Sequence, residues 1–134
     1  MRLNILSDSE WESGIGQVVV WLSKTEYFRE FQERNYGSGL VAVAVNLICQ
    51  NPIFLFERRI RYSKKEKKIY LDIMLNLSDF VNVSFDERRR IVLNALLKEV
   101  PEVIGKYSIE SFDVKTFLAD FNNKFEPLVK QSPA

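Results

Sequence analysis

The chain has 134 residues, 46% hydrophobic and 28% charged, which fits a globular domain and excludes disordered and low-complexity classes. Nineteen basic residues face eighteen acidic ones, so the net charge of +1 indicates no class of partner. With no histidine and one cysteine, Cys49, an intramolecular disulfide, histidine-based acid/base catalysis and the usual zinc sites are excluded. We expect a single domain over residues 1–134, with no cofactor, no metal and no enzymatic activity.

The N-terminal segment is predicted to be mainly helical. Leu3 and Ile5 are compatible with a short first strand. Ser7–Glu10 has the pattern of a capping box, which predicts a helix over about 8–23. Aromatic residues at helical spacing predict a second helical piece that ends near Asn35–Gly39. The apolar face of the first helix would be formed by Trp11, Ile15, Val18, Val19 and Leu22.

The stretch Leu40–Cys49 is ambiguous, because ten mostly apolar residues fit either a buried strand or a buried helix. Its alternating β-branched residues favour a strand. It is about half as long as a membrane-spanning helix, and Asn46 interrupts it. Met1–Asp8 contains no apolar segment of signal-peptide length. We therefore expect a cytoplasmic protein that does not bind a membrane.

The clearest β signal is a hairpin over about 54–75, whose two arms flank the charged turn Ser63–Lys68. Apolar and polar residues alternate along both arms. Placing Ile60 opposite Leu71 aligns the two apolar faces, and it also places Arg59 opposite Asp72. Burial and charge therefore predict the same register.

The C-terminal part is predicted to be helical again. Ser84–Glu87 is a second capping box, and Asp113 is a good N-cap for a final helix. Residues 129–134 are expected to form a frayed tail. The elements together predict an α+β fold, in which an antiparallel sheet packs against N- and C-terminal helices. This sheet would contain the hairpin at about 54–75 and a strand at about 40–49.

Several candidate partner-binding residues share the polar face of the hairpin. Protein interfaces favour arginine and aromatic anchors, and this face carries Arg59, Arg61, Tyr70 and Asp72. The alternative is that these four residues only stabilise the sheet as a cross-strand ladder. Trp21 lies outside the centre of the apolar stripe of the first helix, so we expect it to be partly exposed and a fifth candidate. Core packing is the alternative for Trp21.

The hairpin is also the most basic part of the chain. Residues 57–68 contain seven basic and two acidic residues, a net charge of +5. A basic β-ribbon can contact a phosphate backbone, so a nucleic-acid-associated module is the alternative function. Solvated lysines at a hairpin tip more often serve to prevent edge-to-edge aggregation. We therefore do not expect nucleic acid as the partner.

Three segments resemble small immunity proteins of bacterial polymorphic-toxin and contact-dependent growth-inhibition systems. They are Arg59–Leu75, Glu87–Arg89 at the start of a helix, and Lys106–Ile109 followed by Phe112 and Asp113. The resemblance covers about residues 36–121. It implies a protein that binds the C-terminal domain of a cognate toxin, often a nuclease, and neutralises it by stoichiometric association. It transfers no catalytic or contact residues to this chain.

Overall fold

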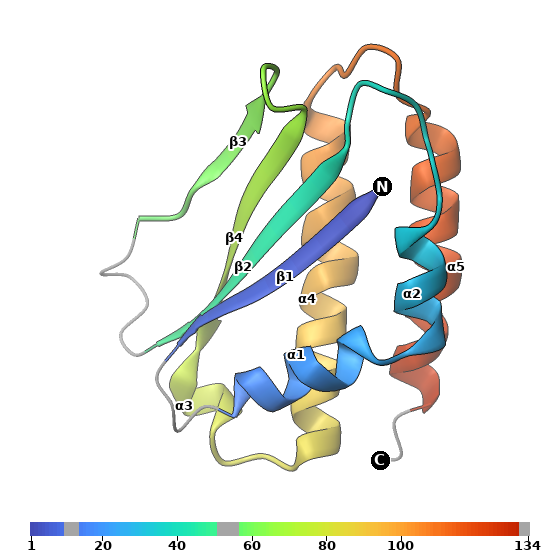
Figure 1. The fold of residues 1–134 in the computed structure, drawn as a ribbon. Coiled ribbons are helices and arrows are strands. Elements are labelled where there is room, and N and C mark those ends of the chain that lie inside the picture. The colour runs from blue at the N-terminus through green and yellow to red at the C-terminus, as the bar shows by residue number, and fades with distance from the viewer. Residues whose placement is uncertain (10–13, 51–56, 132–134) are drawn as a thin grey trace.

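The computed structural model describes residues 1–9, 14–50 and 57–131, and it confirms the α+β class. Figure 1 shows α2, α4 and α5 grouped on one side of the sheet, with no described helix on the opposite side. In chain order the elements are β1 (Arg2–Ser9), α1 (Ile15–Ser23), α2 (Glu26–Gln32), β2 (Ala42–Gln50), β3 (Ile60–Ser63), β4 (Lys68–Asn76), α3 (Leu77–Phe80), α4 (Phe85–Lys106) and α5 (Val114–Gln131).

The sheet has four strands in the order β1-β2-β4-β3. The prediction of an antiparallel sheet is correct for β3 and β4 only, because β1–β2 and β2–β4 are both parallel pairs. A parallel pair requires a crossover connection, and α1 and α2 lie within the connection between β1 and β2. β3 occupies the edge beside β4, so β4 lies between β2 and β3 and runs in the direction of β2.

The predicted hairpin register is confirmed, since Ile60 is paired with Leu71. The first arm is shorter than predicted, because β3 begins only at Ile60 and residues 54–56 lie outside the described residues. The ambiguous stretch Leu40–Cys49 forms a strand, as favoured by its alternation, and becomes β2 in the interior of the sheet.

The first capping box was a wrong prediction. Ser7 and Ser9 belong to β1, whose eight residues all pair with β2, and the first helix begins only at Ile15. Gly14, at the N-cap, has a φ of 71°, a left-handed conformation that glycine adopts without strain. The long parallel pairing outweighs the local capping preference of the serine. Glu10 and Trp11, which the prediction also used, lie outside the described residues.

The core lies between the sheet and the helices. Every second residue along the central part of β2 and β4 is almost completely buried. These residues are Val43, Val45 and Leu47 of β2 and Ile69 and Leu71 of β4. These side chains pack with apolar residues of all five helices in one continuous cluster. The described residues therefore share one contiguous hydrophobic core.

The two C-terminal helices follow the predicted caps. The Ser84 hydroxyl accepts a hydrogen bond from the Glu87 backbone N–H at 3.1 Å, and α4 continues without interruption through Pro101. The predicted tail was wrong for residues 129–131, because α5 extends to Gln131 and Val129 packs against the core. Residues 132–134 lie outside the described residues.

The cap of α5 predicts a pH dependence of stability. The Thr116 hydroxyl and backbone N–H both donate to the Asp113 carboxylate, at 2.7 and 3.1 Å, and these bonds lower the pKa of Asp113 below its ordinary 3.8. A lowered folded-state pKa adds stability above the unfolded pKa, and this stability is lost as the pH falls through the folded value. Asp113→Asn should therefore keep the cap at neutral pH but show a smaller loss of stability on acidification below about pH 4.

Urea denaturation of both proteins between about pH 2.5 and pH 7 measures this difference. Parallel pH profiles for the wild type and Asp113→Asn would contradict the assignment of this titration to Asp113.

Candidate partner-binding face

The four hairpin candidates lie together on the side of the sheet that no described helix covers, which we call the helix-free face (Figure 1). Tyr70 and Asp72 alternate with the buried residues Ile69, Leu71 and Ile73 of β4, so their side chains point away from the core. Residues in register on neighbouring strands extend this face across the sheet, in two rows that run perpendicular to the strands. One row is Asn4, Ala44, Tyr70 and Arg61, and the other is Leu6, Asn46 and Asp72, with Arg59 beside Asp72.

Two guanidinium groups pack against one aromatic ring. The guanidinium carbons of Arg59 and Arg61 lie 4.9 and 4.6 Å from the centre of the Tyr70 ring. The Tyr70 hydroxyl donates a hydrogen bond to Glu66, and this bond raises the pKa of Tyr70 above its ordinary value. Both arginines are exposed, whereas Tyr70 is half-buried. The arrangement holds two exposed cations beside one ring, and each such cation–π contact contributes roughly 0.5–1 kcal/mol.

Asp72 differs from the other three candidates in that its side chain is buried, with only 6% of the residue exposed. Its Oδ2 accepts a hydrogen bond from the Arg59 backbone N–H at 2.8 Å, and its own N–H donates to the Arg59 carbonyl at 2.8 Å. The Arg59 guanidinium lies 4.0 Å from Oδ1. The predicted pairing of Arg59 with Asp72 is therefore confirmed, and this pairing fixes the chain at the entry to β3.

Arg58 also fixes the chain where it enters β3, through contacts with β4 and with α4. Its Nε donates to the Asp72 carbonyl oxygen at 2.7 Å, and its guanidinium forms an ion pair with Glu99 of α4. The backbone that carries Arg59 and Arg61 is thus tied both to β4 and to a helix of the core layer. A side chain on such a backbone is positioned before a partner arrives, which lowers the entropic cost of binding.

Trp21 is in a separate part of the molecule. It lies on α1, is half-buried and packs against the core, with the Arg89 guanidinium carbon 4.7 Å from its ring centre. Arg89 also forms an ion pair with Asp86 within the first turn of α4. The structure therefore brings Arg59, Arg61, Tyr70 and Asp72 together and places Trp21 at the contact between α1 and α4, within the helix layer.

Three lysines of the basic hairpin lie in the turn between β3 and β4, and Lys68 is the first residue of β4. Lys64, Lys65 and Lys67 are exposed in the turn, and Lys67 has a φ of 56°. Lys64 and Lys67 also border a polar hollow of about 260 Å³, beside Ser38 and Ser108. The positive charge therefore extends from Arg59 and Arg61 to the tip of the hairpin, at one side of the helix-free face.

The described residues contain no cluster of three or more metal-ligating side chains. Cys49 is buried on the core side of β2, as expected for a cysteine that acts as a small apolar residue. Among the helices of the described segments, none is sufficiently long and apolar to cross a bilayer.

The outer edge of β1 is a surface feature that was not predicted from the sequence. This strand is long and forms one side of the sheet, and Leu6 on it is 65% exposed, the largest exposure of the bulky apolar residues in the described part of the chain. The signal was present as alternation through Leu3, Ile5 and Ser7, but Ser7 was assigned to a helix cap. A strand assignment for residues 2–9 would have identified the strand, and its place at the edge follows only from the strand order of the sheet.

Comparison with known protein families identifies the chain. The model of the family described as Immunity protein 44 matches residues 1–126. The chain belongs to the Immunity protein 44 family. The resemblance to bacterial immunity proteins is therefore confirmed, and this member of the Immunity protein 44 family shares the family pattern over almost its whole length. No curated protein and no solved structure matches it.

Proposed function

We propose that this immunity protein neutralises one cognate toxin by binding its C-terminal domain stoichiometrically, without catalysing a reaction. The observation that carries the proposal is the family match over residues 1–126. The role requires a preformed binding surface rather than a reactive centre. The helix-free face supports it, because Arg59, Arg61 and Tyr70 are the residue types that dominate binding energy at protein interfaces.

The partner surface should be acidic where it meets β3. Residues 57–68 have a net charge of +5, and complementary charge increases the rate of association and discriminates against wrong partners. The proposal places the complex in the cytoplasm of the toxin-producing bacterium. We further propose that the neutralised toxin is a nuclease, as toxins of polymorphic-toxin systems often are.

The test is affinity capture of the tagged protein from its own bacterium at moderate salt, with mass spectrometry of the bound material. We expect one protein in near equimolar amount, matching the C-terminal end of a large secreted protein. Expression of that domain alone should arrest growth, and co-expression of this chain should restore it. A captured domain that remains toxic during co-expression would contradict the proposal.

A matched variant separates protein binding from nucleic-acid binding. Reversing the charge of Lys64, Lys65, Lys67 and Lys68 should slow association with the toxin but leave growth protection intact. The reason is that the anchors Arg59, Arg61 and Tyr70 keep their positions on the helix-free face. Recovery of nucleic acid that washes away with salt, and is lost in this variant, would favour the alternative function.

A further inference from the structure

The free edge of β1 is equipped to accept another strand. In a parallel ladder the backbone groups of successive residues point alternately to the two sides of the strand. Arg2 donates to Val41 in the direction of β2, so the N–H and C=O groups of Leu3, Ile5 and Ser7 point outward. Within the described residues, neither Ile5 nor Ser7 makes a hydrogen bond on this outer side, and Ser7 is exposed. Such unpaired groups form a template for pairing.

Leu3 is the first residue whose backbone groups point outward, and a side chain already occupies both of these groups. The Gln32 side-chain amide donates to the Leu3 carbonyl at 2.8 Å, and its oxygen accepts from the Leu3 N–H at 3.0 Å. One amide group thus supplies the donor and the acceptor that the peptide group of a neighbouring strand would supply. The next outward position, Ile5, has no such side chain beside it among the described residues.

A hollow lies beside this edge, between the strand and the first two helices. It has a volume of about 430 Å³ and is lined by residues 3–6 of β1, by Val19, Leu22 and Ser23 of α1, and by Phe28 and Gln32 of α2. None of these residues carries a charge, so the lining is complementary to an uncharged segment rather than to a charged one. Its size is within the range that encloses a few apolar side chains.

The edge is continuous with the helix-free face. Leu6 lies on that face and is in register with Asn46, which is in register with Asp72, beside Arg59. Four strands span about 14 Å, which is well within the width of an ordinary protein interface. One partner can therefore contact the arginines at β3 and the edge of β1 together.

We propose that the cognate toxin adds an extended, uncharged segment to the outer edge of β1, with an apolar side chain in the adjoining hollow. The added strand takes the hydrogen bonds of Ile5 and Ser7 next to the position that Gln32 occupies. This inference rests on the proposed function for the identity of the partner. Strand addition of this kind obtains affinity from backbone hydrogen bonds and specificity from side-chain pockets.

The test uses the toxin domain recovered in the capture experiment and the full-length immunity protein. Hydrogen–deuterium exchange of the unmodified protein should show fast exchange at the Ile5 and Ser7 amides when free, and at least tenfold slower exchange in the complex. Ser7→Pro removes an outward N–H that the sheet does not use, a position where an edge strand tolerates proline. We expect it to weaken binding about tenfold or more, with little change in thermal stability.

A second pair of variants tests the hollow. Ser23→Lys places a long charged side chain in the hollow from an exposed position, and it should also weaken binding about tenfold. Val20→Lys is the matched control, because Val20 is on the same helix, is 52% exposed and does not line the hollow.

The outcomes separate the two proposals. A tight complex with unchanged exchange at Ile5 and Ser7, or with full affinity in Ser7→Pro and Ser23→Lys, would overturn strand addition and leave the proposed function intact. Failure of the unmodified protein to bind the recovered domain would count against both.

Discussion

Replacing Arg61 with glutamate is expected to weaken toxin binding by about two orders of magnitude while the protein remains folded. Arg61 is exposed on the edge strand β3, so little of its side chain is needed for the core. The intramolecular loss is its contact with the Tyr70 ring at 4.6 Å, worth roughly 0.5–1 kcal/mol of folding stability. The expected loss in the complex is larger, because a cation is replaced by an anion that would face the acidic partner surface proposed above.

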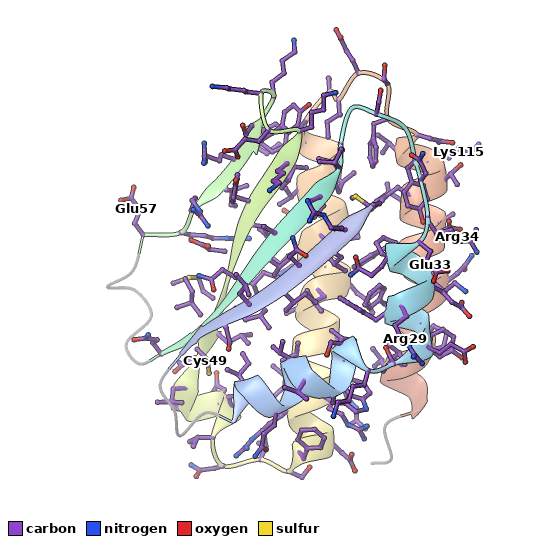
Figure 2. All side chains as sticks on the ribbon, viewed as in Figure 1. Arg29, Glu33, Arg34, Cys49, Glu57 and Lys115 are labelled. Carbon is purple, nitrogen blue, oxygen red and sulfur yellow. The ribbon has the colours of Figure 1, made fainter. Side chains whose placement is uncertain are left out.

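Isothermal titration of the recovered toxin domain against the variant measures this loss, and circular dichroism verifies the fold. Arg29→Glu is the matched control, since it makes the same charge change at an exposed position on α2, on the opposite side of the molecule from β3 (Figure 2). Equal effects of the two variants would indicate that only net charge matters. Unchanged affinity in Arg61→Glu would move the interface away from β3.

Replacing Phe31 with alanine is expected to destabilise the protein by about 4 kcal/mol. The Phe31 side chain is completely buried, and its ring centre lies 5.5 to 5.9 Å from those of Tyr36, Phe117, Phe121 and Phe125. The substitution therefore leaves a cavity at the contact between α2 and α5 and removes four aromatic contacts. This loss is a large fraction of the total stability of a typical domain.

Urea denaturation measures the effect as a change of the midpoint at an unchanged slope. Phe85→Ala provides the comparison, because Phe85 is 38% exposed at the start of α4 and its removal should cost below about 1 kcal/mol. Similar losses in the two variants would mean that the cluster around Phe31 is not a principal source of stability.

The candidate site was predicted in part because its members are local in sequence. Arg59, Arg61, Tyr70 and Asp72 belong to one hairpin, and the alternation of the two arms was sufficient to place them on one face in the correct register. The burial of Asp72 was not predictable in the same way. It depends on the backbone at Arg59, and on Arg58, which contacts both β4 and α4.

Trp21 illustrates the limit of helical periodicity. Its offset from the apolar stripe correctly indicated partial exposure, but the offset contains no information about the neighbour that covers the rest of the ring. That neighbour is Arg89 on α4, which is 68 residues further along the chain. A contact of this separation is decided by how the helices pack and not by either helix alone.

The α+β class, the strand character of β2, the pairing of Ile60 with Leu71 and the caps at Ser84 and Asp113 were all predictable from local sequence patterns. Each of these depends on interactions between residues that are close in the chain, or on the period of a single element. Three features depend on long-range contacts and were not predictable: β1 extends through Ser9, β2 is parallel to both of its neighbours, and Gln32 pairs with Leu3 at the edge. The reason is that backbone hydrogen bonds between distant strands carry no sequence pattern, and in β1 they outweighed the local preference of a serine for a helix cap.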